Sequence, residues 1–219
     1  MIRILIADDH AILRVGLRQI LSECGDIQVA GESSNGAEAL ALLRAEPFDA
    51  LVMDMTMPGR SGIELIKQIK GERPKLPVLI LSMHKEDVYA VRALRAGASG
   101  YLCKDNAETQ LAEAIRKVAG GGLFISPEVT EKLALGLLAG RAGEAPPHTR
   151  LSDREYQIFQ LLAAGHAVTD IAHRLNLSVK TVSTHKTRIL EKMGLANTAD
   201  LVRYAVRHEL IVEGDELAG

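Results

Sequence analysis

The chain has 219 residues, of which 47% are hydrophobic, so it is long enough for two domains with real cores. Its formal net charge is −2, and its two cysteines, Cys24 and Cys103, are too few and too far apart for a disulfide scaffold or a zinc motif. We expect two reduced core thiols.

Two apolar runs of the sequence were considered as a signal peptide and as a membrane span, and neither fits. The first apolar run is short and ends in Asp8-Asp9, which is unlike a signal peptide. The apolar stretch 133–139 is far shorter than a bilayer span. We therefore expect a soluble, cytoplasmic protein that does not act at a membrane.

Residues 1–125 alternate apolar strand-like runs with amphipathic helix-like segments. Strands are predicted near 3–7, 27–31, 49–53, 77–81 and 99–102, and helices near 10–23, 36–45, 61–71, 85–96 and 107–119. Continuous apolar strands that alternate with helices favour a parallel sheet covered on both faces. The fold class predicted is α/β, a flavodoxin-like (βα)5 doubly wound sheet.

Polar side chains follow four of these predicted strands. Asp8 and Asp9 follow the first, Asp54 the third, Ser82 the fourth and Lys104 the fifth. Ligands of doubly wound sheets bind outside the carboxyl ends of the strands, so we expect these five residues to share one crevice. Taken singly, Asp8, Asp9 and Ser82 have a simpler interpretation as helix caps, and Lys104 as a solvated loop charge.

Taken together, these side chains describe a site for a metal ion and a phosphoryl group. Asp8, Asp9 and Asp54 form an oxygen-only set that suits Mg²⁺. Lys104 and Ser82 are able to contact phosphate oxygens, and the Asp54 carboxylate is the candidate nucleophile for an aspartyl phosphate.

Between the two halves of the chain we predict a helix and a linker. Ser126-Pro127 is typical of the N-cap and first residue of a helix, which we expect to run to about Leu138. Residues 139–150 contain two glycines and two adjacent prolines, a composition that excludes regular structure.

From Leu151 onward every segment is predicted to be helical. Ser152 and Glu155 form a capping box, and short helices near 168–175 and 179–193 flank a tight turn at 176–178. A last helix covers about 198–208. Two helices joined by a three-residue turn, the second one basic, match the spacing of a helix-turn-helix.

The second half is also the basic part of the chain. Lys and Arg number 8 against 5 Asp and Glu in residues 151–208, whereas residues 1–125 carry 15 against 16. This asymmetry indicates a polyanionic partner for the second half only. The helix at 179–193 carries Lys180, Lys186, Arg188 and Lys192, which would suit DNA phosphates; a solvated helix face is the simpler alternative.

The strand-end residues resemble a known family. Asp-Asp after the first strand, Asp-x-x-Met-Pro-Gly after the third, Ser after the fourth and Lys after the fifth look like the receiver domain of two-component response regulators. The resemblance implies that Asp54 accepts phosphate from a sensor histidine kinase, and that Asp8 and Asp9 hold Mg²⁺ with the backbone carbonyl of Thr56. It further implies that Ser82 and Tyr101 form a switch pair and that Lys104 binds the phosphate. The alternative for Tyr101 is a static core residue.

The second half resembles the LuxR-type helix-turn-helix. The resemblance rests on Leu-Ser-x-Arg-Glu from 151, Ile-Ala-x-x-Leu from 171, Leu-Ser-x-Lys-Thr-Val-x-x-His from 177 and Ile-x-x-Lys-Met from 189. With the receiver in front, the whole chain resembles the NarL/FixJ family of response regulators. The implied DNA contacts are Lys180, Thr181, Ser183, Thr184, His185, Lys186, Thr187, Arg188 and Lys192.

We therefore predict a receiver at 1–122, a connecting helix and linker at 123–150, and a helix-turn-helix domain at 151–219. The expected function is transcription control, in which phosphorylation of Asp54 governs homodimerisation and binding of double-stranded DNA. The last helix is a candidate dimer surface, or alternatively is buried within its own domain. Two other functions stay open: a DNA-binding protein with a relic receiver, and an aspartate-nucleophile phosphatase.

Overall fold

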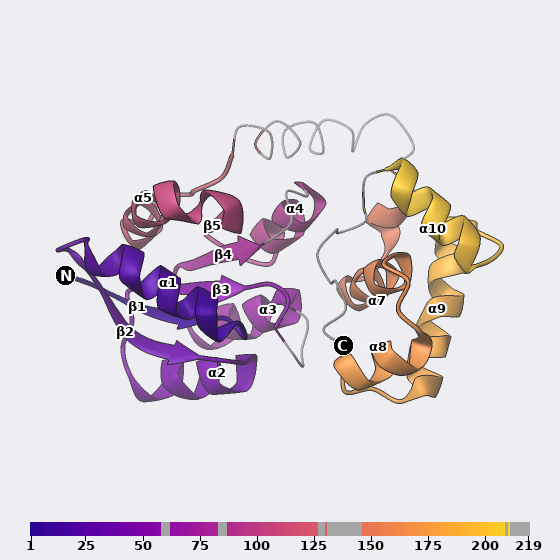
Figure 1. Cartoon of the computed structure of the whole chain (residues 1–219), viewed down its shortest axis with the longest axis horizontal. Helices are drawn as coiled ribbons and strands as arrows, with labels where there is room; N and C mark the ends of the chain where they lie inside the picture. The colour runs from indigo at the N-terminus through magenta and orange to yellow at the C-terminus, as the bar shows by residue number, and fades with distance from the viewer. Residues whose placement is uncertain (58–61, 83–86, 127–129, 131–145, 209, 211–219) are drawn as a thin grey trace. The chain divides into compact units, whose positions relative to one another are not determined.

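The computed structural model describes residues 1–57, 62–82, 87–126, 130, 146–208 and 210. The chain folds into two compact units, Met1–Gly136 and Leu137–Gly219. Figure 1 labels the helices and strands of both units. Among the described residues, no helix is both long enough and apolar enough to span a membrane.

The first unit alternates strands and helices in the predicted order. Its strands are β1 (Ile2–Ala7), β2 (Ile27–Ser33), β3 (Ala50–Asp54), β4 (Val78–Ser82) and β5 (Gly100–Cys103). Its helices are α1 (Ala11–Ser22), α2 (Gly36–Ala45), α3 (Gly62–Glu72), α4 (Asp87–Arg95), the short 3₁₀ helix η1 (Lys104–Asn106) and α5 (Ala107–Ala119). The strands pair in parallel in the order β2-β1-β3-β4-β5. This arrangement confirms the doubly wound prediction.

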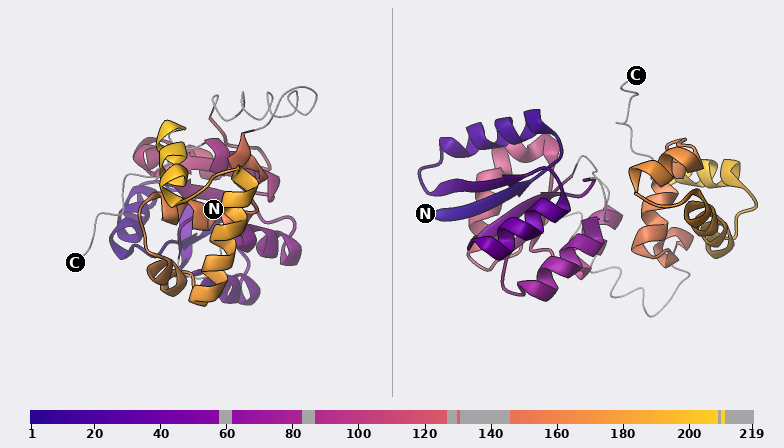
Figure 2. Two further views of the ribbon diagram at one scale, coloured as in Figure 1. Left: turned by 90° about the vertical axis from the view of Figure 1, so that its right-hand side faces the viewer. Right: turned by 90° about the horizontal axis from the view of Figure 1, so that it is seen from below.

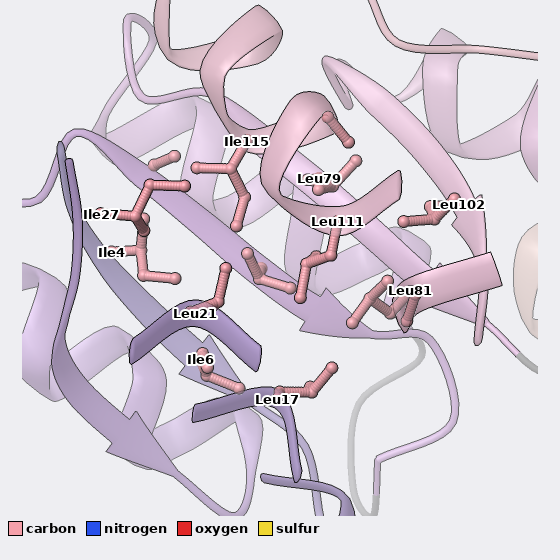
Figure 3. Packing of buried hydrophobic residues seen from close by; sticks show 14 of the residues in the cluster. Ile4, Ile6, Leu17, Leu21, Ile27, Leu79, Leu81, Leu102, Leu111 and Ile115 are labelled. Carbon is pink, nitrogen blue, oxygen red and sulfur yellow. The ribbon is translucent and has the colours of Figure 1, made fainter. Parts of the chain in front are cut away.

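Helices cover both faces of this sheet, as the right-hand view of Figure 2 makes visible. Leu17 and Leu21 of α1 and Leu111 and Ile115 of α5 point toward the sheet residues of one face (Figure 3). All five residues of β3 and all five of β4 are buried, which explains why the first four residues of each strand are apolar rather than alternating. The buried strands thus hold the residues at their carboxyl ends in fixed positions.

The carboxyl ends of β1, β3, β4 and β5 lie level with one another. Ala7 of β1 pairs with Met53 of β3, Asp54 pairs with Leu81, and Ser82 pairs with Cys103. The residues that end or follow β1, β3, β4 and β5 are therefore brought to a single edge of the sheet. This edge is where the polar residues were predicted to meet.

The second unit is helical throughout its described part. It contains the 3₁₀ helix η2 (Pro147–Arg150), α7 (Asp153–Ala163), α8 (Val168–Arg174), α9 (Val179–Met193) and α10 (Thr198–Arg207). The Ser152–Glu155 capping box is present, and Ser178 accepts a hydrogen bond from the backbone N–H of Thr181. Gly194 ends α9 in the left-handed conformation, with φ 66°. The predictions from these capping signals are thus confirmed.

One prediction for the linker is wrong. Residues 147–150 were expected to lack regular structure, yet they form the 3₁₀ turn η2 with Pro147 at its first position. The fixed φ of proline suits the first residue of a helical turn, so a proline pair does not exclude one. His148 of this turn is buried, and its Nδ1 lies 2.7 Å from the Tyr204 hydroxyl of α10. The predicted helix from Ser126 to about Leu138 lies almost entirely outside the described residues.

Candidate functional site

Three of the predicted residues meet closely at the carboxyl edge of the sheet. Lys104 Nζ lies 2.8 Å from Asp8 Oδ2 and 3.0 Å from Asp54 Oδ2. Asp8 and Asp54 are each 1% exposed, and the Lys104 side chain is 5% exposed. The interpretation of Lys104 as a solvated loop charge is therefore wrong, because its ammonium group is buried between two carboxylates.

Asp8 has a second, structural role. Its Oδ1 accepts a hydrogen bond of 2.8 Å from the backbone N–H of His10, just before α1 begins. The helix-capping alternative is wrong for Asp8, because the N–H group that it binds precedes α1, and its other oxygen faces Lys104. Asp9 is less buried, with 28% of its side chain exposed. Asp8 therefore serves both the backbone turn and the charged cluster.

Asp54 is held from one side by the turn that follows β3. The Thr56 hydroxyl donates a hydrogen bond of 3.0 Å to Asp54 Oδ2, the same oxygen that faces Lys104. The other oxygen, Oδ1, is buried and accepts no hydrogen bond from any described residue. Since a buried carboxylate oxygen without a donor is costly, Asp54 Oδ1 is an open position for an incoming ligand.

The charge of this cluster suits a divalent cation. Three carboxylates, from Asp8, Asp9 and Asp54, gather at this edge, and two of them, Asp8 and Asp54, contact the ammonium group of Lys104. The formal excess is two negative charges, concentrated where burial makes repulsion expensive. This set of oxygen donors fits a Mg²⁺ ion bound by carboxylates and water.

Two residues that the sequence analysis did not select also belong to this edge. His10 Nδ1 lies 3.2 Å from Asp8 Oδ1 and 3.1 Å from Asp9 Oδ1. Arg14 Nη1 donates a hydrogen bond of 2.6 Å to the backbone carbonyl of Asp8. Both lie within the first turn and a half after Asp8-Asp9, and that position in the sequence was the available signal.

The predicted switch pair lies on neighbouring strands. Ser82 is the last residue of β4 and is 0% exposed, whereas Tyr101 is the second residue of β5 and is 6% exposed. The register pairs Ile80 with Tyr101, two positions before Ser82. Both side chains are buried, so any movement of either would have to be compensated by its neighbours.

The second group of predicted residues lies along α9. Val182, Ile189 and Met193 are buried and form the stripe that packs inward. The exposed polar side chains of the helix are Lys180, Ser183, Thr184, Thr187, Arg188, Glu191 and Lys192. The Thr184 and Thr187 hydroxyls donate hydrogen bonds to the carbonyls of Lys180 and Ser183 within the helix.

Lys192 differs from the other predicted cations. Its Nζ lies 2.6 Å from Oε2 of Glu155, the buried acid of the capping box that begins α7. The same oxygen accepts a hydrogen bond of 2.8 Å from the backbone N–H of Ser152. Burial raises the pKa of Glu155, but hydrogen bonds from Lys192 and Ser152 outweigh it and hold the pKa below its ordinary value. Lys192 therefore links α9 to α7.

His185 is partly buried. Burial lowers the pKa of its imidazole below the ordinary 6.5, so the ring is neutral at pH 7. Its Nδ1 is buried and makes no hydrogen bond within the described residues. The positive charge on the middle of α9 therefore comes from Lys180, Lys186 and Arg188 rather than from His185.

Each of the two units matches a known protein family. Residues 4–116 match the response regulator receiver domain, and residues 149–205 match the bacterial regulatory proteins of the luxR family. The first match covers the unit that holds the carboxylate cluster, and the second covers the helices η2 to α10 almost entirely.

Relatives match along nearly the whole chain. Response regulator UvrY of Escherichia coli K12 is 35% identical over 210 residues, covering 96% of each chain. Oxygen regulatory protein NreC of Staphylococcus carnosus is 36% identical over 214 residues, covering 95% of this chain and 99% of that one. The structure of RcsB from Salmonella enterica serovar Typhimurium, bound to a promoter in the presence of phosphomimetic BeF3⁻, has a TM-score of 0.67, 32% identity, and coverage of 93% and 97%. The chain thus belongs to the NarL/FixJ family of response regulators, with a receiver domain followed by a LuxR-type DNA-binding domain.

Proposed function

We propose that this response regulator controls transcription through phosphorylation of Asp54 by a sensor histidine kinase. The observation that carries the proposal is the buried cluster in which Lys104 bridges Asp8 and Asp54 while Asp54 Oδ1 stays open. A carboxylate with one oxygen held and the other free is oriented for attack on phosphorus.

In the proposed phosphoryl transfer, one bond forms and one breaks at phosphorus. Asp54 Oδ1 attacks the phosphorus of a phosphohistidine, a P–O bond forms, the P–N bond breaks, and the leaving imidazole takes up a proton. Lys104 is placed to pair with a phosphoryl oxygen. We assign Asp8, Asp9, Asp54 and the Thr56 carbonyl as the residues that hold Mg²⁺, which would neutralise the charge of the phosphoryl group.

The proposed response starts from the new charge on Asp54. A phosphoryl group adds roughly −1.5 to −2 charge and three acceptor oxygens. Ser82 and Lys104 would turn toward these oxygens, and the Tyr101 ring would fill the space that Ser82 leaves. Because Ser82 and Tyr101 are both buried, this exchange would change packing at β4 and β5 rather than only the surface charge.

The proposed output is DNA binding by α9. Lys180, Lys186 and Arg188 would contact phosphates, and the hydroxyls of Thr181, Ser183, Thr184 and Thr187 would reach phosphates or base edges, as would His185. Lys192 enters this set only if its ion pair with Glu155 opens. The likeness to RcsB bound to a promoter supports duplex DNA as the partner.

We propose a homodimer on DNA, because helix-turn-helix proteins read paired half-sites through two-fold symmetry. On α10, Leu201 and Ala205 are buried within the unit, whereas Val206 is 60% exposed. The predicted dimer surface is thus reduced to the outer side of α10. The DNA partner and the kinase's phosphoryl donor both belong to the cytoplasm, where we place the protein.

The test of the receiver site is labelling with acetyl phosphate and Mg²⁺. We expect wild type to gain one phosphoryl group per chain, visible as a mass shift in intact-protein mass spectrometry, and Asp54→Asn to gain none. Asp26→Asn is the matched control, because Asp26 is an exposed carboxylate paired with Arg116 away from the cluster. Labelling that survives Asp54→Asn would disprove the assignment of the acceptor.

The same samples also test the two alternative functions, a relic receiver and a phosphatase. A relic receiver would leave wild type unlabelled while DNA binding persists. A phosphatase would release phosphate from p-nitrophenyl phosphate over many turnovers, and Asp54→Asn would abolish that release. Single labelling of Asp54 without turnover is the result that we expect.

A further inference from the structure

The exposed face of α9 carries methyl groups among its polar side chains. Val179, Thr184 and Thr187 are all exposed, and none of them belongs to the buried stripe of the helix. Thr187 lies three positions after Thr184 and eight positions after Val179, and both spacings place side chains on one side of a helix. The three residues therefore contribute to a common outer surface.

The hydroxyl protons of the two threonines are already used inside the helix. Thr184 Oγ1 donates a hydrogen bond of 2.9 Å to the carbonyl of Lys180, and Thr187 Oγ1 donates one of 3.2 Å to the carbonyl of Ser183. A hydroxyl has a single proton, so while these bonds persist neither oxygen can donate to DNA, although each can still accept. The branch of Cβ that is not tied to the helix is the methyl group.

The fold of α9 does not account for the side chain of Val179. The helix start is capped by Ser178, whose side chain accepts a hydrogen bond from the backbone N–H of Thr181. A β-branched residue at the next position adds nothing to helix formation. Val179 is also 47% exposed, so it is not needed to fill the core of the unit.

The chemistry of this surface matches one base in the major groove. Thymine presents a 5-methyl group there, and threonine methyls and other small apolar groups contact it. Guanine presents only acceptors, for which neither a methyl group nor a hydroxyl without a free proton is a partner. Lys180 and Arg188, which are exposed on the same helix, suit the phosphates on either side.

We infer that α9 recognises thymine through methyl contacts from Val179, Thr184 and Thr187, so that these residues select A·T pairs in each half-site. The inference rests on the proposed DNA binding and specifies the base that is read. The hydroxyl oxygens of the two threonines remain at the same base edges as acceptors, and the amino group of the paired adenine is a suitable donor. Val179 thereby joins the residues that contact DNA.

The competing explanation is that the two threonine hydroxyls leave the helix carbonyls and donate to DNA, while the methyl groups stay passive. Paired substitutions separate the two explanations, because serine keeps the hydroxyl without the methyl and valine keeps the methyl without the hydroxyl. Donation by the hydroxyls predicts that Thr184→Ser and Thr187→Ser behave as wild type. Methyl contact predicts that these two variants lose their preference for thymine.

The experiment begins with a duplex that the full chain, phosphorylated by acetyl phosphate and Mg²⁺, enriches from a random-sequence pool. Each thymine is then replaced by uracil, one at a time, which removes only the 5-methyl group. Fluorescence anisotropy should show wild type binding about 3- to 5-fold more weakly at each contacted position, the factor for one buried methyl-sized group. Val179→Ala, Thr184→Ser and Thr187→Ser should each abolish this difference at one position.

Thr184→Val and Thr187→Val should retain the difference between thymine and uracil, because the methyl group is kept. Thr109→Ser is the matched control, since Thr109 is an exposed threonine of the receiver whose hydroxyl also donates to a backbone carbonyl, that of Asn106. Wild type that is insensitive to uracil, or methyl-deleted variants that keep the wild-type sensitivity, would overturn the inference while DNA binding stands. A wild type that enriches no sequence would instead reject the proposed sequence-specific DNA binding, and the inference with it.

Discussion

The surroundings of Lys104 turn an ordinary loop lysine into a buried cation held between carboxylates. A lysine that follows a strand is ordinarily a solvated charge, but here only 5% of the side chain is exposed and Nζ contacts two buried carboxylates. Removing the ammonium group would leave the buried Asp8 and Asp54 carboxylates without the cation that now lies between them. The stability of the receiver should therefore depend on either this lysine or a metal ion.

The first prediction concerns Lys104→Met. Without added metal, we expect the variant to lose about 3 to 5 kcal/mol of unfolding free energy, because a buried pair has been broken. Millimolar Mg²⁺ should restore much of that loss, since binding to the folded state alone stabilises it. Urea denaturation with and without Mg²⁺ measures both effects. Lys75→Met, at an exposed lysine, should show neither, and a metal-independent loss in Lys104→Met would contradict the prediction.

The second prediction concerns Glu155 and pH. The carboxyl has a pKa below its ordinary 4.5 in the folded state, so the unfolded chain takes up its proton first as the pH falls. The stability that Glu155 contributes is full above about pH 4.5 and disappears as the pH falls through the folded value. At pH 7 we expect Glu155→Gln to cost about 1 to 2 kcal/mol, moderated by the partly exposed Lys192.

Urea denaturation of both proteins between pH 7 and about pH 3 measures this contribution. The stability gap between wild type and Glu155→Gln should narrow toward the acid end. Asp153→Asn is a suitable control, because Asp153 lies in the same first turn of α7 but is not the acid that holds Lys192. A gap that stays constant with pH would mean that the Glu155 charge is not what stabilises the helix.

At the scale of elements, α9 is positioned by both of its ends. Its start is fixed by the Ser178 cap and by Asn176, which has φ 52° and so occupies the left-handed region. Its end is fixed by Gly194 and by the pair between Lys192 and Glu155. The middle presents its exposed face with little freedom to rotate, because Val182 and Ile189 are buried beneath it.

The third prediction tests the turn before α9. Asn176→Val should destabilise the helical unit by roughly 1 to 2 kcal/mol, because a β-branched residue is strained at positive φ. Asn176→Gly should be close to neutral, since glycine adopts this conformation freely. Thermal unfolding monitored by circular dichroism compares them. Equal losses in the two variants would show that the Asn176 side chain, rather than the backbone angle, matters.

The fourth prediction tests the exposed face of α9. Lys180→Ala and Arg188→Ala should each weaken binding to duplex DNA and reduce the slope of log affinity against log salt by about 0.9, the value for one lost phosphate contact. Fluorescence anisotropy with a labelled duplex at several salt concentrations measures the slope. Lys75→Ala on the receiver removes the same charge and should leave the slope unchanged. Unaltered slopes in both α9 variants would remove this face from the DNA contacts.

Most elements were predictable because their signals are local. The apolar runs of β3 and β4, the Ser152–Glu155 capping box and Gly194 each indicate an element within a few residues. The meeting of Asp8, Asp54 and Lys104 was predictable because parallel strands end at one edge. The pairing of Lys192 with Glu155 was not, since it joins side chains 37 positions apart and depends on how α7 and α9 pack.

The structure differs from the sequence-based expectation at two other places, His10 and residues 147–150. His10 was overlooked because a histidine after two acids resembles an ordinary helix-start residue until the ring direction is known. The turn at 147–150 was expected to be irregular because adjacent prolines usually end structure, whereas burial of His148 against Tyr204 stabilises it. The His148–Tyr204 contact is tertiary and the His10 contacts depend on the direction of its ring, and sequence periodicity encodes neither.

For the whole molecule, the proposal requires that an event in one unit alter the other. The fifth prediction is that acetyl phosphate increases DNA affinity of the full chain by at least about 5-fold, a typical allosteric coupling, and that Asp54→Asn abolishes the increase. Our hypothesis is that the receiver blocks the α9 or dimer surface until Asp54 is phosphorylated, which is a shift between pre-existing states. Anisotropy titrations, with sedimentation of the same samples, measure affinity and dimerisation together.

Equal DNA affinity for phosphorylated wild type and Asp54→Asn would contradict this coupling. A fragment of residues 146–219 provides the reference state, because it lacks the receiver altogether. If the receiver inhibits, the fragment should bind as tightly as the phosphorylated full chain. Tighter binding by unphosphorylated full chain than by the fragment would indicate that the receiver assists rather than blocks.

The buried His148 has a practical consequence for anyone who exchanges sensory inputs between regulators. A junction placed at Leu151, where the helical pattern begins in the sequence, would discard η2 and leave the Tyr204 hydroxyl of α10 without its partner. A chimaeric regulator should instead take its helical half from Pro146 onward. The graft then carries its own anchored first turn, and the foreign input is joined to a segment that is already part of the fold.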